Sequence, residues 1–504
     1  MTMQPPIVWS IAGLDSGGGA GLSADQRAAD AIGVHLCPAA AALTAQNSAA
    51  VEAVFPVPPA QLDAQLAALA GDLPPAAIKT GLLGGVEQLR VVVRWVDRLR
   101  ERAPVALVVD PVLGATTGAS FADEALLRAY REDLLPRATV ATPNRREAAR
   151  LVGDGAPAGQ ARKLGSASAC ITGGDEAGPL ALDWLSSPQA NGWLALPRRK
   201  ATNSHGTGCC FATGLAAALA RGFVAADAAV LAKMLTTSGL HGAAAPGAGA
   251  GPVRPQAGFI RDASLLPALF DGEPGGWPGR RGGGVEGVYG ITDSGADAAE
   301  LFTQGLQTVQ LRVKRGDADA DWPARLRAEL RPALDAARRH GATLILNDHW
   351  REALQAGVDF IHLGQEDLLA LSAAERLELA AARANGLRLG LSSHSLWELA
   401  RAVAWAPDYI ACGPVWPTLT KAMPWRPQGL DNLAWWAAMA PAPVVGIGGV
   451  LAPDQLTSIA ATGASAGCVV RGLKAVGVEP WQQAWREGRA RAWQGGAGWP
   501  HASL

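Results

Sequence analysis

The sequence lacks an excess of charge of either sign. Its 504 residues carry 44 lysines and arginines against 45 aspartates and glutamates, which gives a formal net charge of −1. A chain so close to neutral produces no bulk field that attracts nucleic acid or an anionic membrane. We therefore expect neither as a partner, and any affinity for phosphate must come from local sites.

Cysteine is also scarce, and its pattern excludes two classes of protein. The six cysteines are Cys37, Cys170, Cys209, Cys210, Cys412 and Cys468. No pair has the C-x-x-C spacing of a metal site, and so few scattered cysteines do not make a disulfide framework.

A long uninterrupted apolar run is missing as well. The most apolar stretch extends from Phe211 into Leu235, and Arg221, Asp227 and Lys233 interrupt it. It therefore predicts a buried helix pair and not a membrane span. No charged segment followed by an apolar one opens the chain, so we expect no signal peptide and a cytoplasmic protein.

Glycine and proline are abundant near the middle of the chain. From Ala243 the sequence reads AAAPGAGAGPVRPQ, then a short apolar piece, then GEPGGWPGRRGGG up to Gly284. Such a composition does not hold a regular element, although a long loop within one domain is the alternative. Because strand and helix patterns restart at Val285, we predict domains at 1–250 and 285–504, joined by a linker at 251–284 with one patch that docks on a domain.

Both halves show the alternation of strands and helices that is typical of α/β proteins. Strand candidates in the first half include Ile7–Ile11, Ala106–Val109, Thr139–Ala141 and Ala169–Ile171. Eight follow in the second half: Gly287–Ile291, Thr308–Leu311, Thr343–Leu346, Phe360–His362, Arg388–Leu391, Tyr409–Ala411, Val444–Ile447 and Gly467–Val470. Eight βα units in about 210 residues predict a (β/α)₈ barrel with its active groups just after the strands.

The strongest motif of the first half is Asn-Ser-His-Gly-Thr-Gly-Cys at 203–209, directly before a helical pattern. Glycines at a helix start let several backbone N–H groups converge on an anion, and the helix dipole strengthens that field. The same helix end favours a thiolate, so Cys209 is a candidate for taking a proton from a substrate hydroxyl. A simple glycine turn with an inert cysteine is the alternative.

Polar groups also follow two strands of the first half. Asp110 ends the strand ALVV, and Asn144 and Glu147 open the helix after the next strand. Carboxyl ends of parallel strands are where open α/β sheets hold ligands. These three residues are candidates for a Mg²⁺ site, although each alone is equally a turn or a cap.

The order of the motifs is more specific than any one of them. IAGLDSGGGAGLSAD, ALTAQNS, IKTGLLG, VVDPVLG, TPNRREA and SHGTGC follow one another over roughly residues 7–245. In this order they resemble the hydroxymethylpyrimidine and hydroxymethylpyrimidine-phosphate kinases of the ribokinase-like superfamily, which have an open α/β sheet. The resemblance implies that Gln46 binds the aminopyrimidine edge, with Gly13, Asp25 and Leu82 in the same pocket.

The resemblance also implies the roles of the catalytic groups. Cys209 would be the base, and ATP would be the co-substrate with Mg²⁺ as cofactor. The anion hole would consist of Gly206, Thr207 and Gly208, and the Mg²⁺–phosphate end of Asp110, Asn144 and Glu147. Thr172 stands where the family commonly has a lysine that reaches the nucleotide phosphates.

In the second half, Gln310, Arg312 and Lys314 alternate along the end of a strand. Alternation places them on one face, which suits a pyrophosphate, although a solvated basic strand end is the usual explanation for such a pair of cations. Asn347 and Asp348 end the next strand, and Asp367 follows the one after it. Two carboxylates at successive strand ends can share a Mg²⁺.

QLRVK, NDHW, HLGQEDL, LGLSSHS, GPVWPTLTKAMPWRPQGL and VVGIGGV resemble thiamine-phosphate synthase across nearly the whole half. This implies condensation of the pyrimidine diphosphate with thiazole phosphate, with Mg²⁺ on Asp348 and Asp367. The pyrimidine diphosphate would be held by Gln310, Arg312, Lys314, Asn347, Ser392 and Lys421, with Ser392 at its pyrimidine end. The thiazole phosphate would be held by Thr418, Thr420, Gly448, Gly449, Val470 and Arg471.

The two resemblances together imply a bifunctional enzyme of thiamine biosynthesis that acts on small molecules. Three alternatives stay open: a thiazole tautomerase for the barrel, a pyridoxal or sugar kinase for the first half, and one half retained as a ligand-binding module without activity. Gln46 and Cys209 argue against the second alternative. Whether the chain forms a homo-oligomer is also open.

Overall fold

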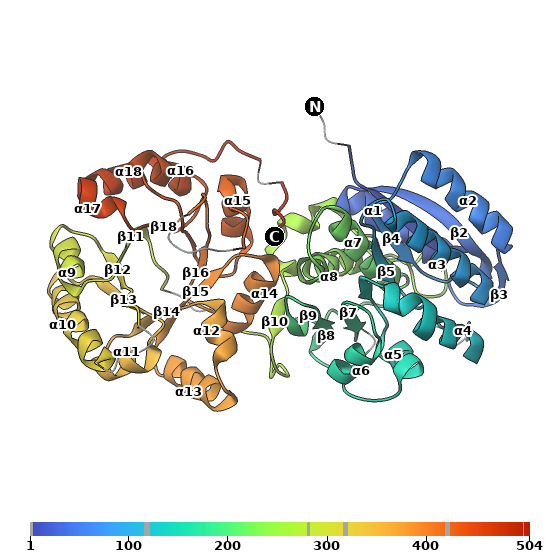
Figure 1. The fold of residues 1–504 in the computed structure, drawn as a ribbon, viewed down its shortest axis with the longest axis horizontal. Coiled ribbons are helices and arrows are strands. Elements are labelled where there is room, and N and C mark those ends of the chain that lie inside the picture. The colour runs from blue at the N-terminus through green and yellow to red at the C-terminus, as the bar shows by residue number, and fades with distance from the viewer. Residues whose placement is uncertain are drawn as a thin grey trace. The chain divides into compact units, whose positions relative to one another are not determined.

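The computed structural model describes residues 4–114, 121–174, 176–279, 283–315, 321–418, 424–496 and 498–504. The chain divides into two compact units, Met1–Trp277 and Pro278–Leu504. Each contains its own sheet, which Figure 1 shows as an open sheet in the first unit and a ring of strands in the second.

The first unit is built on a ten-stranded open sheet in the order β10-β9-β8-β7-β6-β5-β4-β1-β2-β3. The six central strands, in the order β2-β1-β4-β5-β6-β7, run parallel to one another. At one edge β3 pairs antiparallel with β2, and at the other β8, β9 and β10 each pair antiparallel with the strand before them in the chain. The strands are β1 Ile7–Asp15, β2 His35–Gln46, β3 Val51–Pro56, β4 Ala77–Thr80, β5 Ala106–Val109, β6 Val140–Ala141, β7 Ala169–Thr172, β8 Leu180–Ser186, β9 Asn191–Pro197 and β10 Ala268–Phe270.

Helices cover this sheet because its strands are apolar on both faces. Leu62 and Leu66 of α2 and Leu89 of α3 share a buried core with Trp9 and Ile11 of β1. On α7 and α8, small apolar residues are almost entirely buried, which confirms the predicted buried helix pair. The helices are α1 Gly21–Ile32, α2 Pro59–Asp72, α3 Val86–Arg100, α4 Glu124–Ala129, α5 Arg145–Val152, α6 Pro157–Lys163, α7 Thr207–Ala220 and α8 Ala225–His241.

The segment expected as a linker is largely folded into the first unit. Two short 3₁₀ turns, Ala257–Arg261 and Ala263–Leu265, precede β10, which pairs with β9. Phe259, Ile260 and Leu269 are buried. The apolar piece between the two glycine-rich stretches therefore completes a sheet edge, and the first unit extends to about residue 277 and not to 250.

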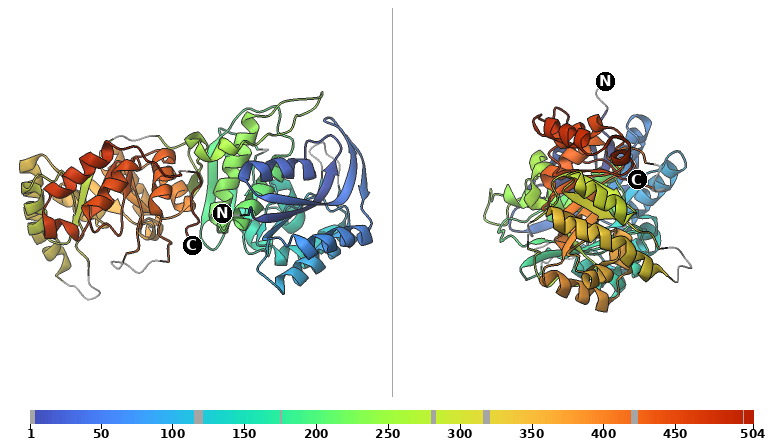
Figure 2. Two further views of the ribbon diagram at one scale, coloured as in Figure 1. Left: turned by 90° about the horizontal axis from the view of Figure 1, so that it is seen from above. Right: turned by 90° about the vertical axis from the view of Figure 1, so that its left-hand side faces the viewer.

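The second unit is a closed barrel of eight parallel strands, as the sequence predicts. Its strands are β11 Gly287–Thr292, β12 Thr308–Leu311, β13 Thr343–Asn347, β14 Phe360–Leu363, β15 Arg388–Ser393, β16 Tyr409–Cys412, β17 Val444–Gly446 and β18 Ala466–Val469. Its helices are α9 Gly295–Thr303, α10 Trp322–His340, α11 Trp350–Ala356, α12 Gln365–Ala370, α13 Ala373–Ala384, α14 Leu396–Trp405, α15 Gly429–Met439, α16 Pro453–Ala461, α17 Gly472–Val476 and α18 Glu479–Arg489. Figure 2 gives two further views of the same elements.

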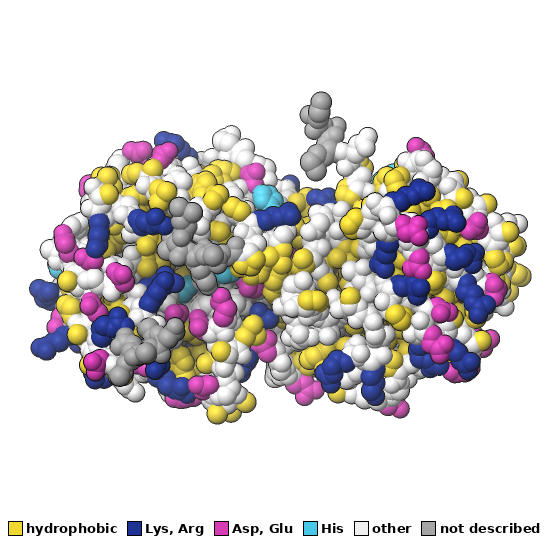
Figure 3. Space-filling model, viewed as in Figure 1, with side chains coloured by type: hydrophobic (Ala, Val, Ile, Leu, Met, Phe, Trp, Pro, Cys, Tyr) yellow, Lys and Arg dark blue, Asp and Glu magenta, His cyan; other side chains and the backbone are white. Residues whose placement is uncertain are grey.

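The surface is mixed in charge. On the face drawn in Figure 3, basic and acidic side chains are interspersed without a large area of one sign. Among the described residues, no helix is both long enough and apolar enough to cross a bilayer.

Candidate active sites

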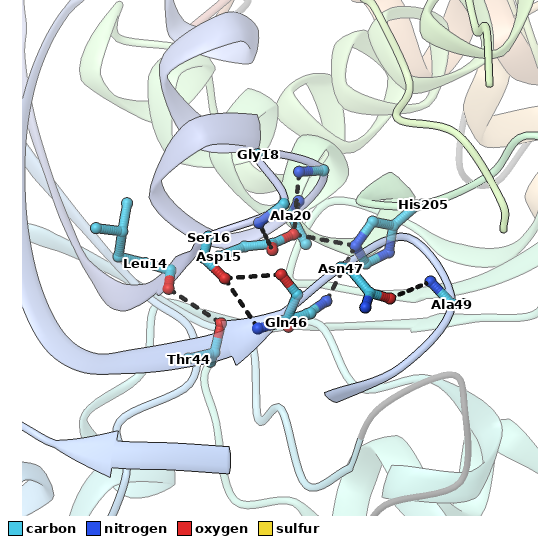
Figure 4. Close-up of polar contacts among 12 residues, drawn as sticks. Leu14, Asp15, Ser16, Gly18, Ala20, Thr44, Gln46, Asn47, Ala49 and His205 are labelled. Atoms are coloured by element: carbon cyan, nitrogen blue, oxygen red, sulfur yellow. Dashed lines mark hydrogen bonds and ion pairs between the residues drawn. The ribbon is translucent and has the colours of Figure 1, made fainter. Parts of the chain in front are cut away.

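Gln46 lies at the carboxyl end of β2, where it meets residues from β1 and from the loop before α7 (Figure 4). Its side-chain nitrogen is 3.3 Å from Nε2 of His205, and the same imidazole nitrogen is 3.1 Å from Oδ2 of Asp15. Ser16 hydroxyl donates to the Gln46 carbonyl and accepts from its amide, which fixes the backbone here. The side-chain amide of Gln46 therefore contacts His205, which Asp15 holds, while Ser16 holds the backbone of Gln46.

Asp15 organises the glycine-rich loop that follows β1. Its carboxylate accepts hydrogen bonds from the amides of Gly17, Gly19 and Ala20, at 2.8–3.0 Å, and contacts His205. Burial works to raise the pKa of Asp15, but the bonds from His205 and from these amides outweigh it and lower the pKa. Asp15 is thus an ionised anchor between the loop and the imidazole.

Gly13 and Leu82 are neighbours, as expected for two residues of one pocket, since a Cβ placed on Gly13 would lie 3.1 Å from Cδ2 of Leu82. Asp25 lies deeper. Its carboxylate is fully buried, accepts from Ser10 and Thr213 at 2.6 and 2.8 Å, and forms an ion pair with Lys79 at 3.0 Å. Asp25 therefore supports the site from beneath, with its charge already neutralised.

Lys79 is fully buried and also lies 4.0 Å from Asp110, so one ammonium group serves two carboxylates. Burial raises the pKa of Asp110 to about 6, with Lys79 opposing and Asp25 adding to the effect. The two carboxylates and the lysine form a dense charge cluster at the ends of β4 and β5 and on α1.

Cys209 lies in the first turn of α7, after Gly206, which adopts a left-handed conformation at φ 84°. The first amides of a helix have no acceptor within the helix itself, and here the Thr207 amide donates at 3.3 Å to the Ser204 carbonyl just before it. The expected thiolate character is not found. Burial, with smaller contributions from Asp25 and Asp110, raises the pKa of the Cys209 thiol to about 12, and Lys79 lowers it only in part.

Asn144 and Glu147 form a capping box at the start of α5. Asn144 Oδ1 accepts from the Glu147 amide and Glu147 Oε2 accepts from the Asn144 amide, both at 2.9 Å. Glu147 Oε1 accepts from the Leu113 amide at 3.4 Å. Their side chains thus cap a helix, the alternative that the sequence left open. Thr172 ends β7, and its amide donates to Pro143.

Part of the glycine-rich stretch after α8 holds the loop before α7. The His205 amide donates to the Gly251 carbonyl at 3.1 Å, and the Val253 amide donates to the His205 carbonyl at 3.0 Å. Asn203 Oδ1 accepts from the Gly251 amide at 2.8 Å. We call Gly249–Val253 the strap, because its Gly249 amide also donates to Ser48 Oγ, two residues after Gln46.

The barrel of the second unit has a cavity of about 340 Å³ at the carboxyl ends of its strands. Ten of the predicted residues line it: Gln310, Arg312, Asn347, Asp367, Ser392, Thr418, Gly448, Gly449, Val470 and Arg471. Seven different strands, β12 to β18, or the loops after them contribute these groups, as expected for a catalytic barrel.

Lys314 does not line this cavity and is exposed. β12 ends at Leu311, so the alternation that places Gln310 and Arg312 on one face does not extend to Lys314. Asp348 is likewise exposed outside the lining, whereas Glu366 lines it next to Asp367.

The predicted residues Thr420 and Lys421 lie outside the described residues. In the described parts of the chain no group of three or more His, Cys, Asp or Glu side chains is placed to hold a metal ion. Mg²⁺ commonly takes only one or two carboxylates and completes its shell with phosphate oxygens and water. Carboxylates beside a cavity lined by Arg312 and Asn347 fit that mode of binding.

A hydrogen-bonded chain that sequence reasoning missed runs through the barrel. Tyr289 contacts Gln310 and Tyr409 at 2.6 and 2.8 Å, and Gln310 Nε2 donates to Asn347 Oδ1. His362 contacts Tyr409 through Nδ1 at 2.7 Å and Ser392 through Nε2 at 2.8 Å. These tyrosines lie within apolar strand patterns, which give no signal of a polar role.

Other missed residues lie within the recognised motifs. Asp15, Lys79 and His205 stand in the stretches IAGLDSGGG, IKTG and SHGTGC, and His394 stands in LGLSSHS. His394 lines the barrel cavity, is bonded to Glu398 at 2.8 Å and stacks on Trp425. The position of these residues within the recognised motifs is the feature of the sequence that could have identified them as site residues.

Comparison with known proteins matches each unit separately. Residues 15–254 match the family model described as phosphomethylpyrimidine kinase, and residues 288–473 match that described as thiamine monophosphate synthase. The first region is 39% identical to a hydroxymethylpyrimidine/phosphomethylpyrimidine kinase of Synechococcus elongatus, over 50% of this chain and 97% of that protein. The second is 46% identical to a thiamine-phosphate synthase of Rhizobium etli, over 36% of this chain and 84% of that protein.

Relatives that span both regions include two plant proteins. One, of Arabidopsis thaliana, is named as a chloroplastic thiamine biosynthetic bifunctional enzyme and is 30% identical over 88% of this chain and 85% of its own length. The other, a protein of Oryza sativa subsp. japonica named as a probable chloroplastic thiamine biosynthetic bifunctional enzyme, is 32% identical over 90% of this chain and 82% of its own length.

Proposed function

The chain belongs to the family of bifunctional thiamine biosynthetic enzymes, and from that membership we propose how its two units share the work. The first unit phosphorylates 4-amino-5-hydroxymethyl-2-methylpyrimidine and then its monophosphate with ATP. The second joins the resulting diphosphate to thiazole phosphate, which gives thiamine phosphate and pyrophosphate. The gathering of ten predicted ligand residues around one barrel cavity is the observation that carries this proposal.

In the first unit Gln46 binds the aminopyrimidine edge, since an amide offers both a donor and an acceptor. The amides of Gly206, Thr207 and Gly208 stabilise the phosphoryl group in transit. Asp110 is the carboxylate best placed for Mg²⁺, because Asn144 and Glu147 cap α5. When bound, Mg²⁺ would neutralise charge on the phosphates.

Cys209 accepts the proton of the substrate hydroxyl. A thiol whose pKa is raised to about 12 is protonated in the unliganded site, so the thiolate forms only in a small fraction of molecules at neutral pH. Lys79 is the cation that favours the thiolate. Kinase turnover that depends on this thiolate rises with pH. As long as the pH is below the pKa of Cys209, each increase of one pH unit raises the thiolate fraction about tenfold.

In the second unit Arg312 and the amide of Asn347 hold the diphosphate, together with Lys421. Asp367 and Asp348 serve Mg²⁺, which would supply charge stabilisation for the leaving pyrophosphate. The loop after β17, with Gly448 and Gly449, and the loop after β18, with Val470 and Arg471, receive the thiazole phosphate, as paired loops at the end of such barrels do. The chemistry is dissociative, so charge stabilisation matters more than a general base.

We also place the protein in the cytoplasm, with small molecules as its ligands and without nucleic acid or membrane as partners. All six cysteines are free, which suits a reducing compartment.

Substitution of Cys209 tests the kinase assignment. We expect Cys209→Ala to reduce formation of the pyrimidine mono- and diphosphates by about 100-fold or more, within the range that a general base contributes. Formation of thiamine phosphate from added diphosphate by the same sample controls for folding of the second unit, and an unchanged denaturant unfolding curve of the first unit controls for its own fold. Undiminished kinase activity would remove Cys209 from the role of base.

A further inference from the structure

The hydrogen-bonded chain inside the barrel joins two ends of the proposed substrate site. It runs Asn347–Gln310–Tyr289–Tyr409–His362–Ser392, with distances of 2.6–2.8 Å from Gln310 to Ser392. Both Asn347 and Ser392 line the cavity, and in the proposed function Asn347 binds the diphosphate and Ser392 the pyrimidine.

Each member of this chain has a limited number of protons. A tyrosine hydroxyl donates once, and a neutral imidazole donates through one nitrogen and accepts through the other. Tyr289 and Tyr409 are almost completely buried, and His362 is 5% exposed. Burial lowers the pKa of His362 to about 3, with Arg312 and His394 adding to the effect, so its imidazole is neutral.

The diphosphate end sets the direction of all the bonds. To bind phosphate oxygens, Asn347 must present its N–H groups to the ligand, and its oxygen then accepts from Gln310 Nε2. Gln310 Oε1 accordingly accepts from Tyr289, whose proton is thereby used. Tyr409 must donate to Tyr289, and His362 Nδ1–H must donate to Tyr409. His362 Nε2 is left as an acceptor for the Ser392 hydroxyl.

We infer that the fixed direction of these hydrogen bonds determines substrate specificity. Because the Ser392 hydroxyl donates its proton to His362, its oxygen can only accept a hydrogen bond from the ligand. Ser392 therefore selects a pyrimidine with a donor, the 4-amino group, over a 4-oxo analogue. Ser392 contacts the ligand, whereas His362, Tyr409 and Tyr289 act through it as positioning residues. The inference rests on the proposed synthase function, which places the diphosphate at Asn347.

Removal of the Tyr289 hydroxyl, which is far from Ser392 along the chain of hydrogen bonds, should reverse the direction of the bonds between Tyr409, His362 and Ser392. In Tyr289→Phe, Tyr409 loses the acceptor for its proton. A buried hydroxyl without an acceptor is costly, so Tyr409 turns to donate to His362 Nδ1. The imidazole then carries its proton on Nε2 and donates to Ser392, whose own proton becomes free to bind a carbonyl of the ligand. Ser393→Ala is the matched control, because Ser393 is also fully buried on β15 but lies outside the chain.

Two measurements on the full-length protein test the inference. In ¹⁵N-histidine-labelled protein we expect the His362 signals, identified by their loss in His362→Gln, to report the Nδ1–H tautomer in the wild type and in Ser393→Ala, and the Nε2–H tautomer in Tyr289→Phe. By calorimetry, the 4-amino diphosphate should bind the wild type about 10- to 100-fold more tightly than its 4-oxo analogue, the range for one mismatched buried hydrogen bond. That ratio should fall at least fivefold in Tyr289→Phe and stay unchanged in Ser393→Ala.

An Nε2–H tautomer in the wild type, or an unchanged ratio in Tyr289→Phe, would overturn the inference even if thiamine phosphate is made. Failure of the wild type to make thiamine phosphate while its tautomer is Nδ1–H would instead contradict the proposed synthase function. Binding is measured in place of turnover because the 4-oxo group also changes the reactivity of the pyrimidine.

Discussion

Several polar side chains of the first unit form ion pairs and hydrogen bonds with one another. Lys79 neutralises Asp25 and approaches Asp110, and Asp15 holds the imidazole of His205 beside Gln46. Removing one partner of a fully buried ion pair leaves an uncompensated charge. Gln46 therefore depends on Asp15 through His205, and the buried carboxylates of Asp25 and Asp110 depend on Lys79.

Asp15 allows a prediction about pH. Its pKa is lowered in the folded protein, so its carboxylate stabilises the fold above the ordinary pKa of 3.8, and that contribution is lost as the pH falls through the lowered pKa. We expect Asp15→Asn to lower the free energy of unfolding by about 1–3 kcal/mol at pH 7. The difference from the wild type should shrink below pH 4.

Denaturant unfolding of the first unit at several pH values measures this difference. Asp72→Asn serves as the control, because Asp72 is exposed at the end of α2 and should change little at any pH. A difference for Asp15→Asn that grows as the pH falls would contradict the assigned role.

At the scale of elements, a glycine lets the loop after β1 and the start of α7 lie in close contact. Gly206 has a φ of 84°, and a Cβ placed there would lie 2.4 Å from the carbonyl oxygen of Gly19. The loop after β1 and the start of α7 therefore approach at a distance that only glycine allows.

Substitution of Gly206 should separate the two activities. We expect Gly206→Ala to displace the first turn of α7 by an appreciable fraction of an ångström and to reduce kinase turnover by about 100-fold, the cost of a misplacement near 1 Å. Synthase turnover of the same protein should be unchanged. Gly159→Ala, on α6, is the control and should alter neither rate. Equal kinase rates for the two variants would show that the close approach of Gly206 to Gly19 does not matter for kinase activity.

The sequence was a good guide to elements and a weaker one to side-chain partners. All eight barrel strands lie within two residues of their predicted bounds, because apolar runs ending in polar groups repeat eight times. Asn144 and Glu147 were ambiguous because the same spacing serves a helix cap and a metal site. The chain through Tyr289 and Tyr409 was hidden, since no local pattern shows which buried residues meet across a barrel.

At the scale of the whole molecule, the family predicted from the order of motifs is confirmed by relatives that match over most of the chain. The thiazole tautomerase alternative is not favoured, since the second unit matches thiamine-phosphate synthases. The boundary near residue 250 could not be placed from composition, because the long-range pairing of β10 with β9 decides it.

The strap and β10 lead to a prediction about truncation. A protein of residues 1–277 should fold and keep kinase activity, whereas a protein ending at residue 250 loses the bonds from Gly251 and Val253 to the loop before α7 and exposes a sheet edge. We expect the shorter protein to unfold at lower denaturant concentration and to bind the pyrimidine more weakly. Equal stability and affinity for the two proteins would show that the strap contributes nothing.

The central claim is that one chain carries two consecutive activities, a kinase and a synthase, which share the pyrimidine diphosphate as product and substrate. The most direct measurement supplies purified full-length protein with hydroxymethylpyrimidine, ATP, Mg²⁺ and thiazole phosphate, and follows thiamine phosphate over time. We predict that the wild type forms it, that Cys209→Ala forms it only when diphosphate is added, and that Asp367→Ala accumulates diphosphate without forming it. Absence of thiamine phosphate from the wild type, with either the alcohol or the diphosphate supplied, would contradict the account.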